Sequence, residues 1–200
     1  MRSITQKDIQ KPINGLFFMI INTAIWTFIS EYYLENKDLR IVGMLLGLVI
    51  ACFLYFYFKL AKAQKKLPET LIEKTAEEKS REKWFLIIFG LEGFGILVVK
   101  NILVNTNHNE LFIPFFALIV GLHFFPLARV FKRTFDYYIA TWTCLLAILG
   151  FYLITQKTVN PYLANVIVSL GCAVSTICYG IRMIFEARTI LWRTNNSNSY

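Results

Sequence analysis

Residues 84–104 read WFLIIFGLEGFGILVVKNILV, an apolar run in which only Glu92 and Lys100 carry charged side chains. The hydrocarbon core of a bilayer is ~30 Å thick, and an α-helix needs about 20 mostly apolar residues to cross it. A membrane-spanning strand would instead show about ten residues of alternating polarity, and this run is continuous. The stretch therefore predicts a transmembrane helix.

Five further stretches share this pattern: 13–34, 41–60, 111–131, 137–154 and 162–185. The 200-residue chain is 56% hydrophobic and only 17% charged, against ~25% charged in an ordinary soluble domain. This composition excludes a disordered chain, a collagen-like chain and a disulfide scaffold. We expect one domain over 1–200, an all-α polytopic membrane protein. Because most links are short and favour antiparallel neighbours, its six transmembrane helices should form three hairpins.

The formal net charge of +8 would suggest a nucleic-acid partner in a soluble protein. Here the basic residues flank the apolar runs. Of the 21 Lys and Arg residues, 17 lie in the N-terminal tail, the connector 61–83 with Lys59, the link after the fourth helix and the C-terminal end. Since cytoplasmic loops carry the excess of Lys and Arg, both termini should face the cytoplasm of a cell membrane, with the lipid bilayer as partner and no nucleic acid.

Two segments lie outside the apolar runs. Residues 61–83 are rich in Lys and Glu, and we expect a cytosolic charged helical connector. It either lies on anionic lipid headgroups or serves as a solvated spacer. Residues 194–200, TNNSNSY, predict a disordered tail.

Three polar side chains within the apolar runs form a candidate intramembrane site. Ionisable residues in a bilayer are costly and are the first place to look for function. Glu92 lies ~12 Å from Trp84, and His123 lies ~9 Å from Arg129, at 1.5 Å per residue, so the two could meet across the hairpin. Asn22 should lie at a similar depth. The site could move protons or bind a ligand, could only join helices by hydrogen bonds, or could face a neighbouring subunit.

Small residues mark candidate helix-packing faces. Gly43, Gly47 and Ala51 recur every four residues, which suits packing within the bundle or dimerisation. The glycines beside Glu92 should permit close helix approach or a local break; they are Gly90, Gly93 and Gly95.

Pro126 cannot donate a backbone hydrogen bond to Leu122. It therefore predicts either a hinge that aims His123 inward or simple curvature of the fourth helix.

The segment around His123 resembles known proteins. It reads G-x-H-F-x-P-L-A, from Gly121 to Ala128. This pattern is similar to a segment of small bacterial multi-spanning membrane proteins of uncharacterised families. The resemblance implies a bacterial membrane protein and no particular activity.

No signature of a hydrolase, a zinc protease or a nucleotide-binding loop occurs in the sequence. We expect no enzyme, no cofactor and no metal site. The sequence favours an integral membrane protein that could be a small ion- or proton-coupled permease. The alternative is a non-enzymatic sensor, immunity or accessory protein that binds a membrane partner. A transporter with so few helices could work as a homodimer.

Overall fold

The computed structural model describes residues 5–35, 37–68 and 75–197, with side chains as far as 193. Six helices dominate this part of the chain: α1 Gln6–Leu34, α2 Ile41–Gln64, α3 Ala76–Asn105, α4 Phe112–Phe131, α5 Thr134–Thr155 and α6 Pro161–Ser197. A short 3-10 turn, η1 Asn109–Leu111, precedes α4. All six long helices are long and apolar enough to cross a bilayer, so the described chain has the all-helical class and the six helices of spanning length that the sequence predicts.

Several helices extend beyond the apolar runs. α1 begins at Gln6 rather than at residue 13. At its start the Asp8 carboxylate accepts a 3.0 Å hydrogen bond from the Thr5 backbone amide. α3 begins at Ala76 with a reciprocal cap: the Glu78 amide donates to the Thr75 hydroxyl, and the Thr75 amide donates to the Glu78 carboxylate, both at 3.2 Å. Such caps satisfy the free amides of a first turn, so polar residues extend each helix past the apolar segment.

The connector and the tail are described only in part. α2 continues to Gln64 and α3 begins at Ala76, so both ends of the connector 61–83 belong to the flanking helices. Residues 69–74 of the connector lie outside the described residues. Of the tail 194–200, expected to be disordered, residues 194–197 continue the backbone of α6, and 198–200 lie outside the described residues.

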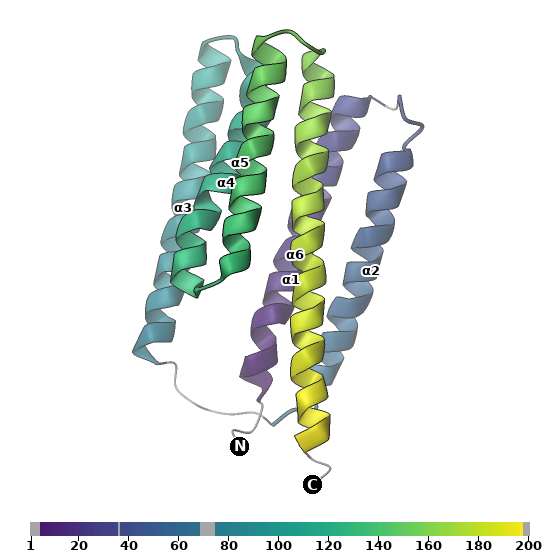
Figure 1. The fold of residues 1–200 in the computed structure, drawn as a ribbon, viewed down its shortest axis with the longest axis vertical. Helices are drawn as coiled ribbons and strands as arrows, with labels where there is room; N and C mark the ends of the chain where they lie inside the picture. The colour runs from purple at the N-terminus through teal and green to yellow at the C-terminus, as the bar shows by residue number, and fades with distance from the viewer. Residues whose placement is uncertain (1–4, 36, 69–74, 198–200) are drawn as a thin grey trace.

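The helices of each expected hairpin are in contact, but the most extensive packing joins α1 to α6 and α4 to α5. α2 and α3 lie at opposite flanks of the bundle (Figure 1). Among the described residues, the backbone of α3 comes close only to α4 and η1, and the backbone of α2 comes close only to α1 and α6. The core is therefore a group of four helices, α1, α4, α5 and α6, with one helix added on each side.

The start of α1 and the end of α6 lie at the same end of the bundle, which we call the terminal end (Figure 1). Small buried residues let the four core helices approach closely: Ala117, Ala140, Ala147, Ala164 and Ala173. Two buried hydroxyl pairs also join α1 to α6, Thr23 to Thr176 at 2.8 Å and Ser30 to Ser169 at 2.9 Å. Hydrogen bonds of this kind between helices stabilise membrane bundles modestly.

Candidate functional site

A cleft of about 530 Å³ lies between α1 and α3, with α4 behind it. Among the described residues α1 and α3 have no backbone contact, so their separation leaves this space. Charged side chains lie near the terminal end of the cleft, and apolar and aromatic side chains line its interior. The deeper polar residues are Asn22, Glu92, His123 and Thr176.

Glu92 of α3 and His123 of α4 form the ionisable pair inside the cleft. Glu92 Oε1 lies 3.5 Å from His123 Nδ1, and the two side chains are only 12% and 9% exposed. An N–H···O hydrogen bond normally spans 2.7–3.2 Å, so this contact is too long for one. Glu92 Oε2 and His123 Nδ1 have no hydrogen-bond partner in the described chain. The pair is close but has unused hydrogen-bonding capacity.

Aromatic rings surround this pair. His123 stacks on Phe124, with ring centroids 4.3 Å apart, and lies 5.5 Å from Phe89. Phe89 is in turn 4.6 Å from Phe85 and 6.1 Å from Phe18 of α1. The walls next to Glu92 are therefore mostly faces and edges of phenyl rings.

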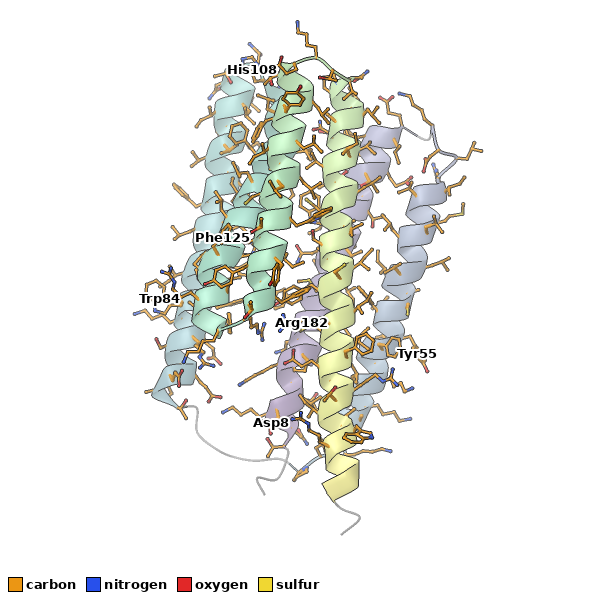
Figure 2. The ribbon with its side chains drawn as sticks, viewed as in Figure 1. Asp8, Tyr55, Trp84, His108, Phe125 and Arg182 are labelled. Atoms are coloured by element: carbon orange, nitrogen blue, oxygen red, sulfur yellow. The ribbon has the colours of Figure 1, made fainter. Side chains whose placement is uncertain are left out.

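The mouth of the cleft is charged and held together by ion pairs. Lys7 Nζ of α1 lies 2.7 Å from Glu78 Oε2 of α3, and Lys11 lies 3.6 Å from the other oxygen of the same carboxylate. Arg81 pairs with Glu77 at 2.5 Å. Glu78 thus joins the two helices that are otherwise apart. Figure 2 shows Trp84 toward the terminal end of α3, which puts this mouth on the terminal side.

Among the described residues, large aromatic side chains lie at the inner end of the cleft. Trp26 is 2% exposed and stacks on Phe116 with centroids 4.9 Å apart. Beyond it, Tyr33 and Tyr162 meet edge to face at 5.6 Å. Trp26 also lines the cleft, so these aromatic contacts lie at its inner end, away from the charged mouth.

Asn22 lines the cleft but takes no part in the contact between Glu92 and His123. Its amide donates a 2.9 Å hydrogen bond to the Phe18 carbonyl one turn earlier in α1. No hydrogen bond joins Asn22 to Glu92 among the described side chains. An amide in a helix can use its own backbone in this way.

The predicted packing glycines have different surroundings. A Cβ on Gly43 would come within 2.8 Å of the Glu31 carboxylate, whose Oε1 accepts a 2.6 Å hydrogen bond from the Gly43 amide. A Cβ on Gly95 would meet only Ile119, at 3.7 Å. Gly47, Gly90 and Gly93 have open space at this position. These three positions meet no neighbouring helix among the described residues, and their role in helix packing stays a prediction.

Ala51 and Pro126 complete the set of predicted residues. Ala51 is exposed on α2. α4 continues unbroken through Pro126 to Phe131. His123 faces the cleft within this continuous helix, and the hinge stays a prediction.

A buried polar cluster that the sequence pattern does not indicate lies where α5 meets α6. Asp136, 2% exposed, accepts a 2.9 Å hydrogen bond from the Tyr179 hydroxyl, which also receives one from Arg133 at 3.1 Å. Arg182, labelled in Figure 2, lies 3.9 Å from Asp136 and stacks over Phe135. Asp136 begins α5 at the edge of an apolar run, so its sequence position looks like an ordinary helix start. Only the packing of α6 shows that it is buried.

Chemically, the cleft combines an acid, a base and aromatic walls in a space that opens at one end. A carboxyl group there can hold a proton or a cation, and the imidazole beside it can donate or accept a hydrogen bond. Comparisons with protein-family models, with curated proteins and with solved structures find no match to this chain. The function of the site therefore has to be argued from its geometry.

Proposed function

We propose that this chain is a small proton-coupled carrier of the cell membrane, with both termini in the cytoplasm. The observation that supports this most is the cleft that reaches from the charged terminal end to the Glu92–His123 pair. A carrier needs a site that exchanges with one side of the membrane while the other side is closed. The Trp26–Phe116 stack and the tyrosines beyond it provide that closure.

The charge distribution supports the orientation. The terminal end holds most of the Lys and Arg residues, which favours the cytoplasmic side. In this orientation the cleft is open to the cytoplasm. Glu92 would carry the proton, and His123, 3.5 Å away, would accept a hydrogen bond from it or relay the proton.

A homodimer is part of this proposal. The flanking helices α2 and α3 bury little of their surface within the bundle. Their open positions at Gly47, Ala51, Gly90 and Gly93 would let a second copy approach closely.

Infrared difference spectroscopy in lipid nanodiscs tests the proton site without knowledge of the substrate. The wild-type protein should show a carboxyl band that responds to bulk pH and shifts when H₂O is replaced by D₂O. The band should disappear in Glu92→Gln and persist in Glu110→Gln, a matched change at the closed end. A Glu92 band that ignores both pH and D₂O would contradict the proposal and would favour a protein that acts through partner binding.

A further inference from the structure

Glu92 has an acceptor that the protein leaves unused. Glu92 Oε2 is buried without a hydrogen-bond partner, and its neighbour His123, 9% exposed, leaves Nδ1 unpaired as well. Both residues line the cleft. Buried charges in proteins are nearly always paired, so a carboxylate with an unpaired oxygen next to a cleft is a place where a cationic ligand can supply the missing counter-charge.

The basic side chains of the cleft are engaged elsewhere. Lys7 and Lys11 are paired with Glu78 at the mouth, and Glu78 lies ~21 Å along α3 from Glu92 at 1.5 Å per residue. Arg133 donates to Tyr179 and lies over Phe131. The negative charge that Glu92 carries when ionised therefore has only the imidazole of His123 beside it.

The walls around Glu92 suit a cation that also has an apolar body. The faces of phenyl rings attract cations within about 6 Å of their centroids, and aromatic cages recognise quaternary ammonium groups. Phe89 and Phe85 lie on the same helix as Glu92, and Phe18 lies across the cleft, 6.1 Å from both rings. The volume of about 530 Å³ falls within the ~300–1,000 Å³ of sites for drug-sized ligands.

From this geometry we infer that the cleft binds a lipophilic monovalent organic cation, an ammonium or phosphonium group with aromatic or alkyl substituents, beside Glu92. This inference rests on the proposed function and names its substrate class. Binding exchanges one charge for another: the Glu92 O–H bond breaks, one proton passes to water, and the cation takes its place beside the carboxylate. No other bond forms or breaks.

Other titratable or charged groups face the same cleft and contribute to the electrostatic potential in which this exchange takes place. On its own helix they are Glu78, Arg81 and Glu82. On the elements packed around it they are Lys7 and Lys11 of α1, His123 of α4, Arg133 just before α5, Asp136 of α5, and Tyr179 of α6.

The test uses two probes of matched shape and opposite charge, tetraphenylphosphonium and tetraphenylborate, with the full chain in nanodiscs of neutral lipid. Equilibrium binding is measured against empty nanodiscs. Tetraphenylphosphonium should bind saturably and tetraphenylborate should not. Glu92→Gln should weaken binding by about tenfold or more, since a charge-assisted contact is lost. Glu92→Asp should keep part of the affinity, and Glu110→Gln should bind like the wild type.

A second pair of variants keeps the test decisive if Glu92→Gln does not fold. Phe89→Leu should weaken tetraphenylphosphonium binding by about threefold or more. Phe94→Leu, on the exposed side of α3, should leave it unchanged. Equal binding of both probes, or binding that is unaffected by changes at both Glu92 and Phe89, would overturn the inference.

Proton release separates this inference from the proposed function. In weakly buffered solution, tetraphenylphosphonium binding should release up to one proton per bound cation. Binding that depends on Glu92 but releases no proton at any pH would support the cation site and contradict proton coupling. A pH-responsive Glu92 with no bound phosphonium would support the proton site and overturn the cation inference.

Discussion

The Glu92–His123 pair should add no stability to the folded protein, and replacing it with apolar side chains tests this. We consider Glu92→Met, His123→Leu and the double variant. These replacements are similar in size to the original side chains and remove their polar atoms. If the pair is kept for function, the folded state should tolerate both changes.

The expected magnitude follows from the contacts. The 3.5 Å separation of Oε1 and Nδ1 is too long for a hydrogen bond, and Glu92 Oε2 and His123 Nδ1 are unpaired. A buried polar group without a partner costs about 1–3 kcal/mol. Each single variant should therefore raise the free energy of unfolding by up to about 1–3 kcal/mol or leave it unchanged. The coupling between them should stay below ~0.6 kcal/mol, the average for interhelical hydrogen bonds in membranes.

The assay is reversible unfolding by sodium dodecyl sulfate in mixed micelles, followed by circular dichroism, on the wild type, both single variants and the double variant. A double-mutant cycle gives the coupling energy. If each single variant lost more than about 1 kcal/mol and the cycle gave a favourable coupling of similar size, the pair would be joining helices. That result would refute the reasoning from unpaired atoms.

Three further predictions concern packing and charge. Gly150→Ala should lower the free energy of unfolding by about 1–3 kcal/mol, because its Cβ would lie 2.6 Å from Val168 and 2.9 Å from Pro114. Gly93→Ala, in open space, should leave the free energy of unfolding unchanged or raise it by up to ~1 kcal/mol. Equal losses in the two variants would contradict the close approach of α4, α5 and α6. In the same assay, Asp136→Ala should lower the free energy of unfolding by about 2 kcal/mol or more and Tyr179→Phe by about 1 kcal/mol. The first change is larger because it leaves both Tyr179 and Arg182 without their carboxylate. An Asp136→Ala variant as stable as the wild type would mean that the cluster is hydrated. Lys7→Gln removes the 2.7 Å ion pair with Glu78. It should change the free energy of unfolding by less than about 1 kcal/mol but speed amide hydrogen exchange at the start of α3. Unchanged exchange there would show that the ion pair does not hold α3 to α1.

The membrane spans could be predicted from the sequence because each is a local property. Hydropathy over about 20 residues marks the part of a helix that suits a bilayer, and all six spans lie within the helices of the structure. Hydropathy does not report where a helix begins or ends. α1 therefore starts well before residue 13, where the Thr5–Asp8 cap satisfies its first turn.

The contacts in and around the candidate site are of two kinds, and only one kind could be predicted from the sequence. Glu92 and His123 lie on neighbouring helices of one hairpin, so counting the rise from each helix end was enough to bring them to the same depth. The α1–α6 packing and the Asp136–Tyr179 bond join segments far apart in the chain. No local pattern in the sequence indicates such pairs.

Small residues show the same limit. The spacing of Gly43, Gly47 and Ala51 shows that they share one face of a helix but not what that face meets. Of these three residues only Gly43 is closely packed, against Glu31, and most close approaches involve other glycines, among them Gly121 against Cys144 and Gly171 against Leu146. Their surroundings depend on which helices form the core, and that follows from the tertiary arrangement.

Cysteine labelling in sealed vesicles tests most directly whether water reaches the Glu92–His123 pair from the terminal end. In a variant with the four native cysteines replaced, Asn22→Cys places a thiol in the cleft wall and Ser169→Cys places one in the closed core. A membrane-impermeant maleimide added on the terminal side should label residue 22, and residue 169 should stay unlabelled from both sides. If residue 22 were protected on both sides, or labelled only from the opposite side, the cleft would not be the open path that the account requires.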